Sequence, residues 1–491
     1  MRVRRRLGFL AGIALSAALL AGCGGGGGSK PAATGAASIV PDKVSAFVSV
    51  NSNLDSASWQ KAEALLNRFP GKDDVLSSLR SSLEQEGLSW EQDVKPALGN
   101  EIDFVWLDFQ NGGNNLVGIT KPKDVDKFNA MLEQGSSPSV HEEIDGWTVF
   151  ANGQTQLDEF KSLRDNGGRL DGDSVFNDAL DGLPSDSITK AFVRGSAIQS
   201  AIDQAIEQQG GPTGTTADQI GKLDSFGAAV TPESSGIRID AALSGDLKLG
   251  GSGYHADLPS SLPSGATLYL SFNNVGGRLN TLFDDYARTN PSFDQQRAQV
   301  ETALGASLDD IFKLLSGEGA FALYRTASGT PALLFAVRVS DEAKARRVIE
   351  KAAALAQLSG SVNARSVQIG AVQASEFDVS GTAIYAAAFD GKLVITNSRA
   401  SIKSMQSPGT KLAGDPAYTA AVSGAGMPSE TNGFLYANVR SGLDYAFSYA
   451  ESRGSTIPAI AKDNLAPLRG LLLYTTKSGK RFVFTGFLGI E

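Results

Sequence analysis

An internal duplication is the feature that most constrains what this chain can fold into. Residues 39–245 and 262–491 run through the same order of apolar and turn-forming segments. Each half opens with a proline, followed by an alternating strand pattern that ends in asparagine. Such self-similarity is the signature of one structural unit used twice. We therefore expect two similar repeats, joined by residues 246–261.

The order of the expected elements within each half decides the fold class. A strand comes first, followed by two helices, two strands, a helix, further strands, short helices, another strand with its helix, and a closing hairpin. The best-matched segments, at 116–132 and 333–355, each place a strand before an amphipathic helix. Long alternation of strands and helices, which a doubly wound parallel sheet requires, is missing. The sequence therefore predicts the α+β class, with two similar repeats of mixed, mainly antiparallel sheet and helices packed on it.

The first 22 residues have the composition of a secretory signal peptide. Four of the first six residues are arginine, an apolar run at 7–20 follows, and small residues stand at its end. This run is shorter than the roughly 20 residues that a membrane span needs. We expect residues 1–22 to be removed by cleavage between Gly22 and Cys23. The glycine-rich residues 23–38 are expected to form a flexible tether.

The stretch Leu20-Ala21-Gly22-Cys23 resembles the lipobox of bacterial lipoproteins. In that family the cysteine thiol receives a diacylglyceryl group, so the resemblance implies lipid attachment at Cys23. Each buried acyl methylene contributes roughly 0.8 kcal/mol, which makes a two-chain anchor close to permanent. The alternative is an ordinary signal peptide followed by a free thiol, a liability in an exported protein. The resemblance implies a lipid-anchored protein on the outer face of the bacterial cytoplasmic membrane.

The duplicated layout also resembles an uncharacterised family of bacterial lipoproteins, mostly from high-GC Gram-positive bacteria, catalogued as a domain of unknown function. This resemblance covers the chain from Ile39 to its end and rests on the layout and apolar pattern of the two halves. It implies an extracytoplasmic, anchored protein and brings no known activity with it.

Charge and cysteine content exclude several classes of partner and of stabilising bond. The net charge of −9 and the pI of about 5.1 argue against binding nucleic acid or anionic headgroups through bulk electrostatics. No segment after the leader has the length of uninterrupted apolar sequence that a membrane span needs. The single cysteine leaves no intrachain disulfide, so stability must come from buried cores.

The sequence predicts no catalytic, cofactor-binding or metal-ligating residue. The two histidines, His141 and His255, are too far apart in sequence to be assumed to share a metal. Ser-x-x-Lys patterns at 58–61 and 187–190 lack the partner motifs of penicillin-binding enzymes. The acidic stretch 165–173 loosely resembles a calcium loop but lacks the terminal glutamate of an EF-hand, so a solvated turn is expected.

The four tryptophans, all in the first half, are expected to be core residues, with a tryptophan-lined cleft for an apolar or sugar-like ligand as the alternative. The sequence thus favours a non-enzymatic envelope protein that binds or scaffolds an unknown envelope partner, without a cofactor. Two alternatives remain open. One is a carrier that holds a lipid or other apolar ligand between the repeats, and the other is an envelope hydrolase with an unrecognised site.

Overall fold

The computed structural model describes residues 35–109, 113–133, 139–208, 221–248, 251–290, 292–326, 329–358, 360 and 362–491. The expected signal peptide, Cys23 and the tether up to residue 34 lie outside the described residues. The chain divides into two compact units. Unit 1 comprises residues up to 249 together with 458–467 and 478–491, and unit 2 comprises residues 250–457 and 468–477.

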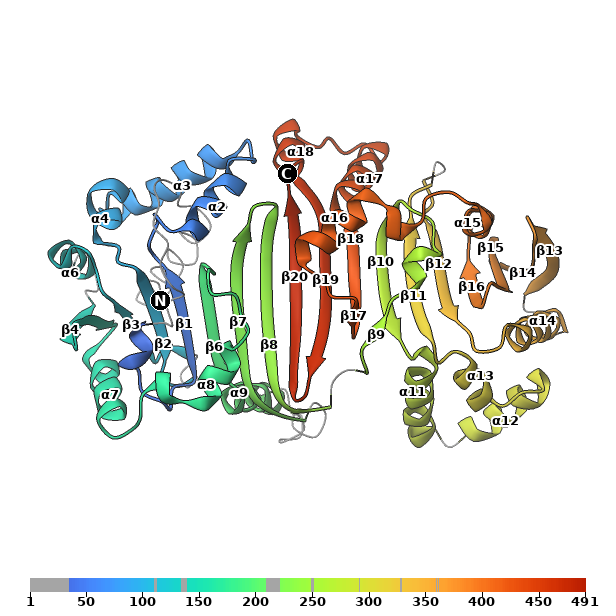
Figure 1. Ribbon diagram of the computed structural model, residues 1–491, viewed down its shortest axis with the longest axis horizontal. Coiled ribbons are helices and arrows are strands. Elements are labelled where there is room, and N and C mark those ends of the chain that lie inside the picture. Colours follow the sequence, from blue (N-terminus) through green and yellow to red (C-terminus); the bar gives the residue numbers. More distant parts are fainter. Residues whose placement is uncertain are drawn as a thin grey trace. The chain divides into compact units, whose positions relative to one another are not determined.

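Unit 1 is built on one antiparallel sheet (Figure 1). The strands follow one another across it in the order β4-β5-β3-β2-β1-β6-β7-β8-β20. Their bounds are β1 Ala46–Asn51, β2 Glu101–Trp106, β3 Leu116–Thr120, β4 Val140–Ile144, β5 Trp147–Ala151, β6 Thr189–Arg194, β7 Gly221–Glu233, β8 Gly236–Leu247 and β20 Arg481–Ile490. The helices are η2 Gly35–Ser38, α2 Ala57–Leu66, α3 Lys72–Gln85, η3 Trp90–Val94, α4 Lys95–Ala97, α6 Val125–Glu133, α7 Gln154–Asp165, η4 Leu170–Gly172, α8 Ser174–Leu180, α9 Gly195–Gln208 and α18 Ala459–Leu465.

Unit 2 also contains one large antiparallel sheet, in the order β13-β14-β15-β16-β12-β11-β10-β18-β19. Its strands are β9 Tyr254–His255, β10 Ala266–Asn273, β11 Glu318–Tyr324, β12 Ala332–Arg338, β13 Asn363–Ile369, β14 Val372–Val379, β15 Thr382–Phe389, β16 Lys392–Thr396, β17 Glu430–Thr431, β18 Gly433–Asn438 and β19 Leu468–Ser478. Its helices are η5 Leu258–Ser260, α11 Val275–Thr289, α12 Phe293–Leu304, α13 Leu308–Leu314, α14 Glu342–Leu358, α15 Arg399–Gln406, η6 Leu412–Gly414, α16 Pro416–Ala425 and α17 Val439–Ser452.

These antiparallel sheets with helices packed on them confirm the α+β class. The two-repeat arrangement stays a prediction. The hairpins form where the sequence supplies residues suited to a left-handed backbone. Between β4 and β5, Asp145 and Gly146 have φ angles of 50° and 74°. Between β15 and β16, Asp390 and Gly391 have φ angles of 48° and 69°. Positive φ at both central residues is the geometry of a tight hairpin turn that matches the twist of the strands.

The main core of unit 1 lies on one face of its sheet. There Phe176 of α8 meets Phe47 of β1 and Phe192 of β6 edge to face, at centroid distances of 5.8 and 5.3 Å. The buried cluster around them includes residues of η2, η4 and α7. On the opposite face, α6 covers the outer strands, with Phe128 packed 5.5 Å from Phe150. Helix α6 therefore closes only part of that second face.

Unit 2 distributes its core in a similar way. On one face, Tyr418 of α16 packs against Tyr436, with centroids 5.2 Å apart, and against Tyr269 of β10. On the opposite face, Ala345 and Ile349 of α14 form a cluster with residues of β15 and β16. Helix α14 therefore covers the outer strands, whereas the inner strands β10 and β18 contact α17, a helix with no buried residue.

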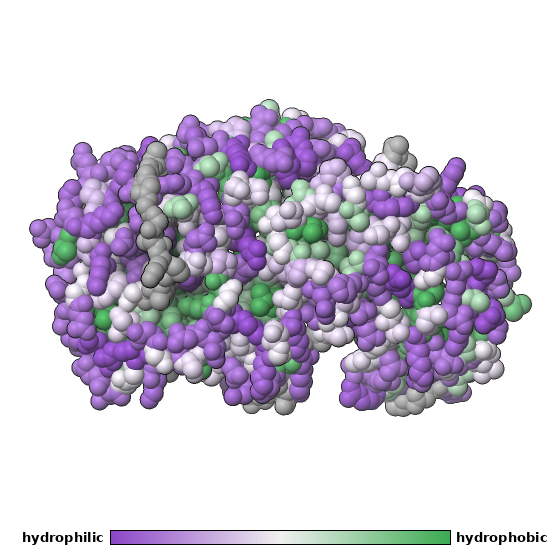
Figure 2. Space-filling view, in the orientation of Figure 1, coloured by the Kyte–Doolittle hydropathy of each residue, from purple (hydrophilic) through white to green (hydrophobic). Residues whose placement is uncertain are grey.

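The tryptophans lie in separate parts of unit 1. Trp59 and Trp147 are buried, whereas Trp90 and Trp106 are half-buried beside two other apolar clusters. Trp59 and Trp147 are therefore core residues, and the tryptophan-lined cleft stays an untested alternative. The outer surface in Figure 2 is mainly hydrophilic, with hydrophobic residues gathered in patches.

One local motif occurs in both units. A short 3-10 helix begins after Arg169 in unit 1 and after Lys411 in unit 2, and each of these basic residues forms an isolated bridge with a proline that precedes β1 or β10. The aspartates that follow, Asp173 and Asp415, cap the next helix by accepting backbone N–H groups of Val175, at 3.0 Å, and Ala417, at 2.9 Å. The same motif therefore ties the start of each sheet to a capped helix.

Candidate functional site

The most unusual feature of unit 2 is an apolar sheet face that stays partly open. One row of side chains crosses adjacent strands in register, formed by Leu473, Leu435, Leu270, Phe321, Phe335 and Ile395. A second row runs beside it, formed by Leu471, Ala437, Leu268, Leu323 and Leu333. We refer to these two rows as the apolar face of unit 2.

Several members of this face are exposed although they are large and aliphatic. Leu270, Leu333, Ile395 and Leu473 are 38%, 40%, 40% and 42% exposed. Alternate residues of the same strands, such as Tyr269, point to the opposite, buried face, because side chains alternate along a strand. These strands are thus apolar on both faces, a pattern typical of sheets covered on both sides. In unit 2, the apolar face is covered only in part, since these four side chains remain exposed.

Unit 1 presents a corresponding row with smaller side chains. It runs in register through Phe104, Val48, Ala191, Ala228, Ala241 and Phe484. Phe104 lies in the cluster under α6, whereas Phe484 at the other end is 40% exposed. Ile239, beside this row on β8, is 51% exposed. We refer to this row and Ile239 as the apolar face of unit 1.

The length of the unit 2 row indicates what such a face can hold. Neighbouring strands lie about 4.8 Å apart, so a row across six strands is on the order of 24 Å long. One leaflet of a bilayer's hydrocarbon core is about 15 Å deep, and this is the depth that acyl chains occupy. A long acyl chain laid across the strands would therefore contact apolar side chains over its whole length. Contiguous exposed apolar surface of this kind marks binding sites in soluble domains.

Buried carboxylates form a second group that sequence reasoning missed. Glu318 of β11 is 5% exposed and accepts the backbone N–H groups of Asp257, at 2.8 Å, and Leu258, at 3.0 Å, at the start of η5. Burial raises the pKa of Glu318 to about 7, although these hydrogen bonds oppose the shift. Nearby, the Tyr254 and Ser271 hydroxyls are 2.7 Å apart. Glu318 thus joins η5 to the sheet and titrates near neutrality.

Unit 1 has a glutamate at the matching strand position. Glu101 stands opposite the asparagine that ends β1, and Glu318 of β11 stands opposite the asparagine that ends β10. The Oε1 atom of Glu101 accepts the N–H of Ala36 in η2 at 3.3 Å. Two residues along, Asp103 is fully buried and stands opposite Ser49 of β1. Burial, reinforced by Glu101, raises the pKa of Asp103 well above its usual value. Asp103 is therefore a carboxyl whose burial favours the protonated form, and it is inaccessible to a substrate.

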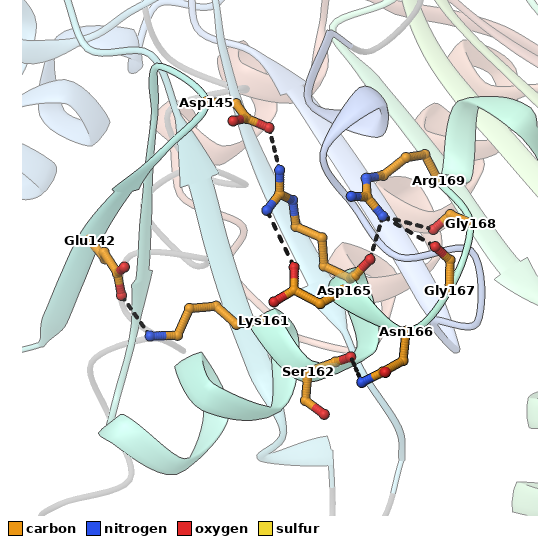
Figure 3. A network of polar contacts seen from close by, with 10 residues as sticks. Glu142, Asp145, Lys161, Ser162, Asp165, Asn166, Gly167, Gly168 and Arg169 are labelled. Carbon is orange, nitrogen blue, oxygen red and sulfur yellow. Dashed lines mark hydrogen bonds and ion pairs between the residues drawn. The ribbon is translucent and has the colours of Figure 1, made fainter.

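The acidic stretch 165–173 is structural (Figure 3). Arg169 donates to the carbonyl oxygen of Arg164, and Arg164 forms an ion pair with Asp145. Asp173 is turned toward Arg194, at 2.6 Å. These carboxylates have separate partners and do not converge. Within the described residues, no three histidine, cysteine, aspartate or glutamate side chains form a metal-holding group.

The remaining sequence candidates are also dispersed. Ser58 donates to the carbonyl oxygen of Asp186, and Lys61 pairs with the Asp186 side chain at 3.2 Å, so this serine and lysine hold a loop. His141 lies on β4 of unit 1, and His255 stands opposite Glu430 in the short β9–β17 ladder of unit 2. The expected lipid-attachment and cleavage residues, Cys23 and Gly22, lie outside the described residues. Of the helices that can be described, none is both long and apolar enough to cross a membrane.

Comparisons with known proteins give a family and a weak structural likeness. A family described as "Protein of unknown function (DUF3352)" matches residues 106–482. Crystal form III of a protein called TP0453 is similar at 12% identity and a TM-score of 0.24, over 48% of this chain and 94% of that one. Crystal form I is similar at 8% identity and a TM-score of 0.23, over 46% and 82%. No curated protein matches significantly.

Proposed function

Because the chain belongs to the DUF3352 family of proteins of unknown function, which brings no activity with it, we propose a function from the site itself. The protein is a non-enzymatic binding protein that holds the acyl chain of a lipid against its apolar sheet faces. The observation that carries this proposal is the row from Leu473 to Ile395, which crosses six strands in register with large aliphatic side chains left in solvent. Burying such side chains against a ligand contributes roughly 25 cal/mol per Å².

The location follows from the lipobox-like sequence. We propose that Cys23 is lipidated after cleavage behind Gly22, and that the protein is anchored at the outer face of the bacterial cytoplasmic membrane. Mass spectrometry of the mature chain should find a diacylglyceryl group on its first residue. Cys23→Ser should release the protein from membranes, since one sulfur carries the anchor. An unmodified thiol, or membrane retention of the Cys23→Ser chain, would remove this part of the proposal.

We further infer that the two units are copies of one unit, each with its own site. The corresponding strand orders, the paired basic-Leu-x-Gly-Asp segments at 169–173 and 411–415, and the matched Glu101 and Glu318 support this inference. It predicts two bound chains per protein molecule. A stoichiometry of one would restrict the site to a single unit.

The binding experiment uses Cys23→Ser protein, so that the chain's own lipid does not compete. Titration with a fluorescent fatty acid should saturate, and native mass spectrometry of the detergent-extracted wild type should detect a co-purifying lipid. Leu270→Glu should weaken fatty-acid binding at the unit 2 site roughly tenfold or more and leave the unit 1 site intact, because it places a charge against the apolar ligand of unit 2 alone. Leu358→Glu is the matched control, since Leu358 is 85% exposed on α14 and outside the apolar face.

Thermal unfolding of both variants checks that they are folded. Equal effects of the two substitutions on binding would refute the site. Failure to bind any fatty acid, together with capture of an envelope protein that Leu270→Glu abolishes, would favour the scaffolding alternative instead.

A further inference from the structure

Helix α11 of unit 2 carries an apolar stripe that continues beyond the body of the unit. Val275, Leu279, Leu282, Phe283 and Tyr286 recur at helical spacing along one side. Val275, at the start, is 8% exposed, but Leu282 and Tyr286, two and three turns later, are 62% and 53% exposed. The apolar side of α11 therefore begins inside the unit and ends in solvent.

The exposed end of the stripe packs against the neighbouring helices α12 and α13. Phe283 packs against Phe293 of α12 and Phe312 of α13, with centroid distances of 5.6 and 5.2 Å. Tyr286 meets Phe293 edge to face at 5.2 Å. Val300, two turns after Phe293 on α12, is 46% exposed. Leu282 is therefore an exposed side chain next to packed aromatic rings of α11 and α12.

The charges of this helical pair nearly balance, with three arginines and four acidic residues. Helix α11 contains two arginines and two aspartates. Arg288 pairs with Asp285, and Arg297 of α12 pairs with Glu301 at 3.0 Å and with Asp309 at 2.7 Å. An ionic partner such as an acidic or basic protein surface would have to displace these pairs. The pair of helices is suited to an apolar, electrically neutral partner.

We propose that the α11–α12 pair docks on the bilayer, with Leu282 entering the region just below the headgroups. This inference rests on the lipid anchor proposed above. Residues 24–34 lie between Cys23 and Gly35, where the described structure begins, and such a segment spans at most about 40 Å. An anchored chain thus always has a bilayer nearby.

The size of the patch also favours a bilayer over a second protein. A standard protein interface buries about 800 Å² on each side, far more than a few side chains supply. Interfacial helices, by contrast, bind through a narrow apolar stripe with aromatic residues at its border, because each inserted side chain contributes separately.

A single-thiol label tests the docking directly. Cys23 is the only cysteine, so the full chain with Cys23→Ser and Leu282→Cys carries one thiol, which is labelled with an environment-sensitive NBD group. The matched control is Cys23→Ser with Thr281→Cys, an exposed position off the apolar stripe and about 100° around α11 from Leu282. Phosphatidylcholine vesicles should raise the emission of the label at 282 roughly twofold or more and leave that at 281 near its value in water. High salt should not reverse the change, because the contact is made by apolar side chains and not by ion pairs with the headgroups.

Partitioning of the unlabelled Cys23→Ser chain gives the second measurement. Leu282→Glu should lower its vesicle partition coefficient roughly tenfold to a hundredfold, whereas Leu358→Glu should leave it unchanged. Equal emission changes at 281 and 282, no change at 282, or an increase at 282 with protein concentration alone would overturn the proposal. Fatty-acid binding is measured separately. Vesicle docking can therefore fail while the proposed fatty-acid binding is confirmed, and fatty-acid binding can fail while docking is confirmed.

Discussion

Glu318 gives the sharpest prediction of how stability depends on pH. This side chain is almost fully buried and caps η5, and its pKa rises from 4.5 to about 7 because burial disfavours the charged form. In the unfolded chain the carboxyl loses its proton near pH 4.5, but in the folded chain only near pH 7. Between these values the unfolded state binds fewer protons than the folded state, so stability falls as pH rises.

The magnitude follows from the size of the shift. The difference between 4.5 and about 7 is roughly 2.5 units, and each unit corresponds to about 1.4 kcal/mol, so the full cost above pH 7 is about 3 kcal/mol. Glu318→Gln keeps the oxygen that accepts from Asp257 and Leu258 but cannot ionise. The variant should match the wild type near pH 4 and exceed its stability by about 3 kcal/mol at pH 7.5, or about 6–12 °C in Tm for a unit of this size.

The assay is denaturant unfolding at a series of pH values, with the transition of unit 2 followed by hydrogen exchange of β10 and β11. Glu350→Gln, an exposed carboxylate on α14, controls for the change in net charge. A difference between the Glu318→Gln variant and the wild type that stays constant from pH 4 to 7.5 would refute the reasoning. A Gln variant less stable at every pH would show that the hydrogen bonds outweigh the burial of charge.

Two further predictions concern unit 1. Asp103→Asn should be more stable than the wild type at pH 7, by about 1–3 kcal/mol, because burial raises the pKa of this carboxyl and so disfavours folding once the unfolded chain ionises; the gain should shrink toward pH 4, and a gain independent of pH would contradict this cause. Gly227→Ala should lower the free energy of unfolding by about 1–3 kcal/mol, because the new Cβ would lie 2.1 Å from the carbonyl oxygen of Ala179. Gly172→Ala, where a Cβ would meet nothing within 4 Å, is its control, and equal midpoints in urea would show that α8 can move aside.

The sequence was sufficient for the fold class because its signals are local. Asp145-Gly146 and Asp390-Gly391 predict tight hairpins by themselves, and alternating runs between such turns predict antiparallel strands. It could not reveal the apolar faces. Leu333 and Phe335 of β12 alternate with Leu334 and two alanines, which are also apolar, a pattern that predicts cover on both sides. Whether a helix supplies that cover depends on where α14 and α17 lie in space, which no local pattern encodes.

The buried carboxylates could have been found in part. Glu101 and Glu318 occur at the same place in the two expected repeats, and a charged residue kept at an inward position is a signal of a specific role. Asp103 has Ala320 at its counterpart, so the comparison of the halves gives no warning of it. Its burial depends on packing by residues distant in sequence.

Strand β20 determines when unit 1 can finish folding. Thr485 of β20 donates to Asp240 of β8 at 2.7 Å, across a separation of 245 residues. Closing so long a loop is entropically unfavourable until many contacts form together, so the assembly of this sheet should be slow and late. Until residues 481–490 emerge from the ribosome or the export channel, β8 has an unpaired edge open to misassociation. Correct folding of unit 1 therefore depends on the last strand of the chain. A chain that ends before residue 481 would lack this strand and leave unit 1 incomplete, although most of unit 1 is encoded first.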